Sequence, residues 1–457
     1  MPSDLEHFFE PKGIAVVGAS PQANSGGNHL LKNIIRGYRG PVYPVNPKYN
    51  EILGLKAYPS VSAINGSVEL AIVFVPARQT PEVLQECVAK GLKGAILENA
   101  GFAEVGFEGK ALQDECIAIA REGLLRLWGP NCMGLIDMKK RYVFSFMLPG
   151  LWDDFYDAGH ISLIVQSGLL SAGFIMSIVS RRILGLAKVC SIGNKSDVNE
   201  IECLEFLLRD PDTKVIALYV ESMSHGRRFL ELAKSSVKPI VVLKGGKSDA
   251  GAKASLSHTA SLAGNYPVFR AALKQAGVRE ADDFFEMVDI ARCLEKGFAR
   301  RSEGPGRVAV LTYSGASGIV TADHLEKHGL ELAVLSPETI KRLQEKLPPW
   351  MPVNNPVDYW PAIEKHGVLE ALKEGLSALH ADRGVDGVIV HLFAGGGHWA
   401  QDHLEIMDGI KNRKKPVLVW IVGLKDEAEH IKRSMESAGW PVFDEIHRVA
   451  KVMSALL

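Results

Sequence analysis

Short runs of β-branched and aliphatic residues alternate with segments of helical length along this chain. In the first part of the chain the runs fall at residues 13–18, 41–45, 70–75, 94–97 and near 127–128. The segments between them, such as residues 81–91, have the spacing of helices. This alternation is typical of an α/β fold with largely parallel sheets.

The same alternation recurs twice more, which predicts three α/β domains in series. Further strand-like runs lie at residues 160–165, 187–191, 215–220 and 239–243, and then at 307–312, 387–392 and 416–420. The polar, glycine-rich stretch 300–306 is typical of a linker. At 457 residues the chain has room for about three domains. We place them at residues 1–145, 150–298 and 305–457, and the first is Rossmann-like.

Composition excludes several classes of function. Lysine plus arginine number 52 and aspartate plus glutamate 53, so no basic excess predicts nucleic-acid binding. No apolar run is long enough to predict a membrane span, and the start lacks the pattern of a signal peptide. Six scattered cysteines lack the spacing of a metal site or a disulfide framework. We expect buried cysteines, no bound metal and a cytoplasmic protein.

The first domain carries a candidate phosphate-binding turn. Gly18, Ala19 and Ser20 follow a strand and precede a helix at about residues 28–36, where backbone amides can face phosphate oxygens. The G-x-G-x-x-G spacing of dinucleotide folds is absent, and Lys48 follows the second strand where NAD requires an acid. A lysine suits the extra phosphate of coenzyme A (CoA) or NADP. The alternative is a glycine turn with an ordinary surface lysine.

Two further strand ends in this domain carry small residues where such folds place ligands. They are Val75-Pro76 and Asn99-Ala100-Gly101. Together with the turn and the lysine, they favour CoA over NAD.

His258 lies in a run of small and polar residues, 251–264, after a strand that ends near Leu243. We predict a mobile loop there, since no large apolar neighbour could bury the imidazole. A histidine on such a loop could carry a covalent group between two places. The alternative is a solvated histidine without a role.

Two features of the second domain suit a phosphoryl group. Gln166, Ser167 and Gly168 precede a helix predicted at residues 169–179, whose first amides would attract an anion. Ser167 could equally be a simple helix cap. Glu221 follows the strand at 215–220, where a carboxylate could orient an imidazole, or could simply be solvated.

In this order the motifs resemble the NDP-forming acyl-CoA synthetases, the superfamily of succinyl-CoA synthetase. The chain looks most like the alpha subunit of the ADP-forming acetyl-CoA synthetases. The resemblance covers nearly the whole chain and rests on residues 16–20, 43–48, 100–102, 129–132, 166–168, 193–198, 219–221, 257–259 and 355–358.

This resemblance implies a Rossmann-like CoA-binding domain followed by two flavodoxin-like, doubly wound parallel-sheet domains. It implies a reversible reaction, acid + CoA + ATP giving acyl-CoA + ADP + phosphate, through an acyl phosphate and a phosphohistidine on His258. Glu221 would orient that histidine, and residues 166–168 would bind its phosphoryl group. CoA would contact Gly18, Ala19, Ser20, Lys48, Val75, Pro76, Asn99, Ala100 and Gly101, and the acyl pocket would include Asn131 and Ala172.

The chain departs from the family pattern at a few positions. Ala260 stands where a glycine is usual, and Val165 stands where a serine is common. These departures fall around the proposed acyl-phosphate pocket, and they are compatible with a different small carboxylic acid as substrate.

No stretch resembles an ATP-grasp domain. We therefore expect a separate beta subunit to supply the ATP/ADP site and Mg²⁺, in an alpha2beta2 complex. Two other functions remain open: a catalytically dead CoA-binding regulatory or scaffold homologue, and an NADP-dependent oxidoreductase that uses the first domain.

Overall fold

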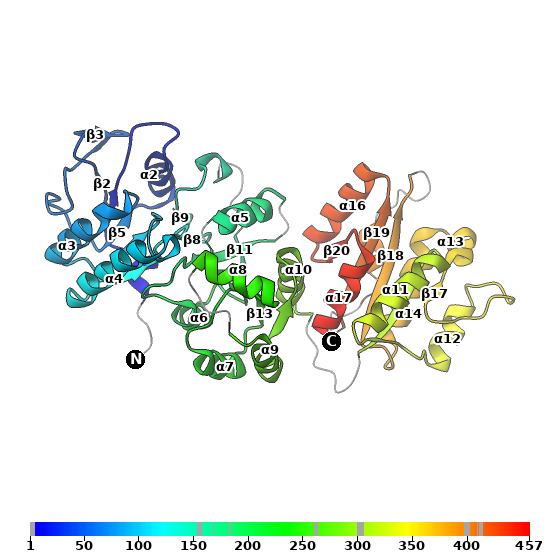
Figure 1. The fold of residues 1–457 in the computed structure, drawn as a ribbon. Helices are drawn as coiled ribbons and strands as arrows, with labels where there is room; N and C mark the ends of the chain where they lie inside the picture. Colours follow the sequence, from blue (N-terminus) through cyan, green and yellow to red (C-terminus); the bar gives the residue numbers. More distant parts are fainter. Residues whose placement is uncertain are drawn as a thin grey trace. The chain divides into compact units, whose positions relative to one another are not determined.

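The computed structural model describes residues 5–152, 158–167, 169–181, 184–259, 264–298, 306–396, 403–408, 410 and 415–457. For residues 169–171 and 255–259 it describes the backbone alone. The chain divides into two compact units, Met1–Ala291 and Arg292–Leu457; the first contains two large, mainly parallel sheets and the second contains one, each flanked by helices (Figure 1).

The first sheet is parallel throughout. Its strands pair in the order β2 (Val42–Val45), β1 (Ile14–Val17), β5 (Leu70–Val73), β6 (Gly94–Leu97) and β7 (Arg126–Trp128). A parallel bridge between Val45 and Tyr58 adds a position beyond β2, which gives the Rossmann order. The other elements are α1 (Glu6–Phe9), α2 (Gly26–Gly37), α3 (Thr80–Lys90), α4 (Phe107–Glu122), η1 (Ala77–Gln79), η2 (Ala103–Val105) and a hairpin of β3 (Glu51–Ile52) and β4 (Leu55–Lys56).

Both faces of this sheet are covered, which explains its uniformly apolar strands. Ile14 and Val16 of β1 belong to the same hydrophobic cluster as the buried leucines of α2. Ala15 and Val17, on the opposite face, belong to a cluster that includes residues of α3 and α4.

The second sheet has seven strands. They pair in the order β14 (Arg279–Ala281), β13 (Ile240–Lys244), β12 (Val215–Val220), β10 (Ala158–Val165), β11 (Leu186–Ser191), β8 (Leu135–Asp137) and β9 (Tyr142–Phe144). The five strands from β14 to β11 are parallel and follow the flavodoxin order, whereas β8 and β9 are antiparallel. The helices are α5 (Leu169–Arg181), α6 (Glu200–Arg209), α7 (Gly226–Ser235), α8 (Asp249–Thr259), α9 (Tyr266–Gln275), α10 (Phe284–Glu295) and η3 (Pro149–Trp152).

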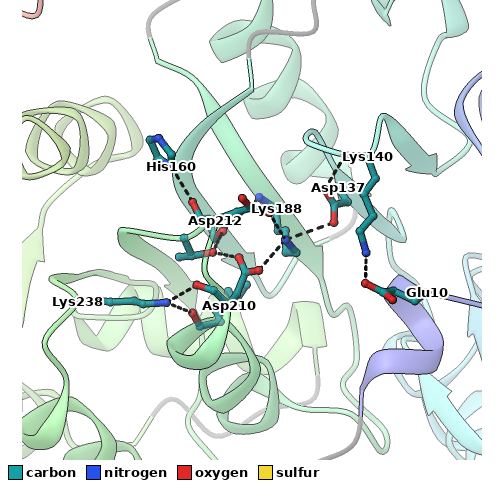
Figure 2. A network of polar contacts seen from close by, with 11 residues as sticks. Glu10, Asp137, Lys140, His160, Lys188, Asp210, Asp212 and Lys238 are labelled. Carbon is teal, nitrogen blue, oxygen red and sulfur yellow. Dashed lines mark hydrogen bonds and ion pairs between the residues drawn. The ribbon is translucent and has the colours of Figure 1, made fainter.

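A buried ion pair fixes β8 against β11. The ammonium of Lys188 lies 3.3 Å from a carboxylate oxygen of Asp137, its partner in the strand register, and 2.9 Å from Asp210 (Figure 2). Burial alone would lower the pKa of Lys188, but the two carboxylates outweigh burial and raise it. The pair gives β8 a specific partner at an otherwise open sheet edge.

Polar contacts join the first two sheets. Arg126 of β7 binds Asp197 and Glu202 at 2.8 Å each, and the indole of Trp128 donates to the carbonyl of Ser191 at 2.7 Å. The hydrophobic cluster that contains Ile14 also continues into the second sheet.

The third sheet belongs to the unit Arg292–Leu457 and is parallel. Its strands pair in the order β16 (Glu331–Leu332), β15 (Arg307–Thr312), β18 (Gly387–Ala394), β19 (Val417–Gly423) and β20 (Val442–Phe443), and β17 (Val357–Asp358) pairs with the end of β15. The helices are α11 (Gly315–Lys327), α12 (Pro337–Gln344), α13 (Trp360–His366), α14 (Val368–Ala381), α15 (His403–Met407), α16 (Lys425–Ser437) and α17 (Ile446–Leu456). Its five main strands follow the flavodoxin order.

These sheets confirm the predicted α/β class. All six cysteines are buried with free thiols, as expected for core residues. Within the described residues, no helix combines the length and apolar character that crossing a bilayer requires.

Candidate active site

The turn after β1 is held so closely that only glycine fits. Gly18 has φ +90°, and a Cβ there would lie 2.1 Å from the carbonyl oxygen of Phe74 at the end of β5. The side-chain amide of Asn46 donates to the carbonyl of Ala19 at 2.8 Å, and Ser20 Oγ accepts from the amide of Gln22 at 3.1 Å. Neighbouring strands therefore fix this turn ahead of α2.

The other residues predicted to bind CoA follow the ends of neighbouring strands. Asn99, after β6, donates from its amide to the carbonyl of Val75 at 2.8 Å, and so ties the end of β6 to that of β5. Pro76 and Ala100 are exposed beside them, and Gly101 has φ +113°.

Lys48 follows β2 and is exposed, and its backbone amide donates to Asn46. Because β2, β1, β5 and β6 are adjacent and parallel, all the predicted CoA residues lie at one carboxyl edge of the sheet. That edge is where ligands bind in open α/β sheets.

Two turns from different sheets meet beside Asn99. Asn131, with φ +57°, donates from its backbone to the carbonyl of Asn99 at 3.0 Å. Asn194, in the loop after β11, donates to the carboxylate of Glu104 at 2.6 Å, and the amide of Gly101 donates to the same carboxylate at 2.6 Å. Burial alone would raise the pKa of Glu104, but these hydrogen bonds outweigh it and lower the pKa.

Glu104 was not predicted from the sequence. It lies three residues beyond the glycine turn, and only the folded chain brings the loop at Asn194 to it.

The segment that carries His258 is a helix, so the prediction of a loop over residues 251–264 is wrong for its first part. Residues Asp249–Thr259 form α8, with His258 in the last turn, while Ala260 lies outside the described residues. The alanines of this run are strong helix formers, and Asp249 suits the first turn. Helix α8 contacts η2, the short helix directly after the turn at Gly101.

Glu221 is 4% exposed at the end of β12. The side-chain oxygen of Gln166, after β10, accepts hydrogen bonds from the amides of Glu221 and Ser222 at 3.0 and 3.2 Å. Gln166 thus fixes the turn that presents Glu221. The phenol of Tyr219 donates to the Glu221 carboxylate at 3.2 Å, and burial followed by this negative charge raises the pKa of Tyr219.

Two lysines with little exposed side-chain surface contact this turn, and neither was assigned a role from its sequence context. Lys195 donates to the carbonyl of Ser222 at 2.8 Å, and Lys244 donates to that of Glu221 at 2.7 Å. Burial lowers the pKa of Lys244, and the positive charge of Lys195 adds to this effect. Two ammonium groups therefore contact the backbone of the turn that presents Glu221, and that of Lys195 is also paired with the carboxylate of Glu200 at 2.9 Å.

The predicted anion-binding helix begins where expected, since α5 starts at Leu169. Gly168 lies outside the described residues. Ser167 is buried, and its carbonyl accepts from the hydroxyl of Ser191 at 3.1 Å. Val165 is the last residue of β10, and Ala172 lies in the first turn of α5, where it is buried. Both residues therefore flank the start of this helix.

Comparison with known proteins identifies the family of this chain. Residues 12–138 match a family model described as "CoA binding domain", and residues 158–294 match "Succinyl-CoA ligase like flavodoxin domain". The alpha subunit of Acetate–CoA ligase [ADP-forming] II from Pyrococcus furiosus is 37% identical over 99% of this chain and 97% of its own length.

Acetate–CoA ligase [ADP-forming] II from Archaeoglobus fulgidus is 36% identical over 98% of this chain, which spans 66% of that longer protein. The acetyl-coenzyme A synthetase 1 of Ca. Korarchaeum cryptofilum, solved with phosphate and ADP, has a TM-score of 0.85 and 31% identity. Its match covers 99% of this chain and 96% of that one. The chain therefore belongs to the family of ADP-forming acyl-CoA ligases, within which it matches an alpha subunit over nearly its full length.

Proposed function

We propose that this chain is the CoA-binding and phosphoryl-carrying alpha subunit of an ADP-forming acyl-CoA synthetase. The observation that carries the proposal is the contact of α8 with η2. It brings the helix of the candidate phosphoryl carrier, His258, next to the turn at Gly101 in the candidate CoA site.

The proposed reaction runs in three reversible steps. A ring nitrogen of His258 attacks the γ-phosphorus of ATP, and ADP leaves. An oxygen of the substrate carboxylate then takes the phosphoryl group from the histidine, which gives an acyl phosphate. Finally the CoA thiolate attacks the acyl carbon and releases phosphate. Phosphoryl transfer of this kind depends mainly on positioning and on neutralisation of charge.

The residues described above suit these requirements. The buried carboxylate of Glu221 would accept a hydrogen bond from one imidazole nitrogen of His258 and leave the other free to attack. The ammonium group of Lys244, which donates to the carbonyl of Glu221 in this turn, would offset negative charge on the transferred group. The amides around Ser167 and Gly168 at the start of α5 would bind its oxygens.

The ATP-grasp nucleotide site and Mg²⁺ would come from a beta subunit in an alpha2beta2 complex. The match to an alpha subunit over 97% of its length supports this division. We also propose a cytoplasmic location and a small carboxylic acid as substrate. An acid panel beginning with acetate, read by CoA consumption in the reconstituted complex, would identify it.

A labelling experiment tests the proposal. The alpha–beta complex is incubated with ATP labelled on its γ-phosphate, and label that is acid-labile and base-stable is measured on the alpha chain. Wild type should acquire label, His258→Ala should not, and Glu221→Gln should acquire it more slowly. The exposed His225, at the start of α7, provides the control: His225→Ala should label like wild type.

Label persisting in His258→Ala would refute the role of that histidine. Absence of label in wild type, together with retained CoA binding, would favour the catalytically dead homologue instead, which no observation here supports. Stabilisation by NADPH rather than CoA in a thermal-shift assay would favour the oxidoreductase.

A further inference from the structure

A strongly positive concavity in the unit Met1–Ala291 takes no part in the proposed reaction. It encloses about 360 Å³, and its charged lining residues are Arg36, Arg39, Lys139, Lys140 and Arg141. The remaining lining residues are Gly37 and Tyr142, so no acidic residue is among those that line it.

Two segments about one hundred residues apart form this concavity, and they are packed tightly together. A Cβ on Gly37, the last residue of α2, would lie 1.7 Å from the carbonyl oxygen of Arg141, in the turn between β8 and β9. Arg141 has φ +60°, and the guanidinium of Arg36 donates to the carbonyl of Pro149 at 2.6 Å. The positive groups are thus presented on fixed backbone.

The charge is larger than the fold itself requires. Cations near a helix C-terminus offset its partial negative charge, which is about half a unit, so one of these side chains would suffice. Lys140 makes an ion pair with Glu10 (Figure 2), and its ammonium lies 6.0 Å from the centre of the Tyr142 ring. Arg39 and Lys139 are exposed. In a chain whose formal net charge is −1, this concentration of positive charge is local.

The size and chemistry of the concavity define a class of ligand. A volume of about 360 Å³ is within the range of small-molecule sites. A guanidinium group can donate two parallel hydrogen bonds to the oxygens of one phosphate group, and an ammonium group contributes a compact positive charge. A ligand with several linked negative charges would be held far more strongly than a single anion.

The concavity is remote from the candidate CoA turn. Helix α2 has 12 residues and runs from the side of the Gly18 turn to Gly37, a distance of about 18 Å at 1.5 Å per residue. Its C-terminus lies toward the opposite, amino edge of the sheet, because the helix runs antiparallel to the strands that it connects.

We propose that this concavity is a second ligand site, which binds an anion of two or three linked phosphate groups. The polyphosphate chain could be free or part of a nucleotide. The proposal is independent of the reaction proposed for His258.

The test is isothermal titration calorimetry on the full chain, saturated with CoA to occupy the candidate CoA site, at about 0.15 M salt. The titrants are inorganic tripolyphosphate, ATP and orthophosphate. The double variant Arg39→Ser/Lys139→Ser removes two exposed cations from the concavity. The control, Arg121→Ser/Lys234→Ser, removes two exposed cations that do not line it.

Tripolyphosphate should bind wild type and the control equally, orthophosphate should bind far more weakly, and the concavity variant should lose about tenfold or more in affinity. Tighter binding of ATP than of tripolyphosphate would identify a nucleotide as the source. The proposal is overturned by either of two results: no tripolyphosphate binding to CoA-saturated wild type, or a concavity variant that binds tripolyphosphate no more weakly than the control variant does.

Discussion

One buried imidazole organises the turn between β15 and α11. Thr321 donates its hydroxyl proton to the carbonyl of Ser317 at 2.8 Å, so at 3.1 Å it accepts from Nε2 of His391. Nδ1 of His391 lies 3.0 Å from the hydroxyl oxygens of both Thr312 and Ser317. Burial lowers the pKa of His391 to about 3, so the ring is neutral near pH 7.

This depressed pKa predicts a pH-dependent loss of stability. As the pH falls below about 6.5, the unfolded chain binds a proton at His391 that the folded chain refuses, so folding weakens by about 1.4 kcal/mol per pH unit. Between pH 6.5 and 5 the unit Arg292–Leu457 should lose about 2 kcal/mol from this group. Calorimetry should show a shallower decline in His391→Gln, whose amide does not titrate. Equal declines in the two proteins would contradict this account.

Lys188 offers a second test at the scale of one side chain. Lys188→Met would leave the fully buried Asp137 and the buried Asp210 without their cation, at a cost of about 3–5 kcal/mol. The thermal transition of the unit Met1–Ala291 should fall by at least several degrees in calorimetry. The exposed Lys234, mutated to methionine, serves as control and should change the transition little. A Lys188→Met transition within a degree of wild type would show that the ion pair contributes nothing.

At the scale of elements, the turn from β1 toward α2 requires glycine for two reasons, its backbone conformation and its packing. Gly18 and Gly54 both have positive φ, at +90° and +78°. A Cβ on Gly18 would collide with the carbonyl of Phe74, whereas a Cβ on Gly54 would meet nothing within 4 Å. A substitution of Gly54 therefore tests backbone strain alone, whereas a substitution of Gly18 tests backbone strain together with a steric collision.

We expect Gly54→Ala to cost about 1 kcal/mol, the usual penalty of positive φ for alanine, and to leave CoA binding unchanged. Gly18→Ala should add the collision, lower the thermal transition further and abolish CoA binding. Thermal shift with and without CoA measures both effects. Equal CoA binding by the two variants would remove the Gly18 turn from the proposed site.

The strands were predictable because parallel strands covered on both faces are uniformly apolar, as in residues 14–17 and 70–73. Helix α8 was not, because its small residues Gly251, Ala252 and Ala254 suggest a loop by size although alanine favours helix. The addition of β8 and β9 to the second sheet depends on contacts such as Lys188 with Asp137, which sequence spacing does not reveal.

The candidate site likewise contains some features that local sequence patterns predict and others that depend on contacts between distant segments. Its glycine turn and strand-end residues follow local rules, and the structure brings the predicted CoA residues to one sheet edge. The contacts of Lys195, Lys244 and Glu104 join loops far apart in the sequence, so no local pattern predicts them.

At the scale of the molecule, the first two sheets share a hydrophobic cluster that includes Ile14 of β1 and Ile164 of β10. The ion pairs of Arg126 cross between the same sheets. The sequence divides this region into two domains by pattern, but the contacts join it into the unit Met1–Ala291, while residues 292–457 form a separate one. We therefore expect the first two sheets to unfold cooperatively as one unit, and not as the two separate domains that the sequence pattern predicts.

Calorimetry of the full chain should therefore show two transitions, with the first two sheets unfolding together. Saturating CoA should raise only the transition temperature of Met1–Ala291. At a CoA concentration one hundred times its dissociation constant, the free energy of unfolding of that unit should increase by about 2.7 kcal/mol. Arg126→Met removes the ion pairs between the sheets, and in that variant the transition should broaden or split. Gly18→Ala is the control, since it should keep a single transition for this unit and lose the CoA shift. Three transitions in wild type would contradict the shared core of the first two sheets. A CoA shift confined to residues 292–457 would contradict the placement of the CoA site.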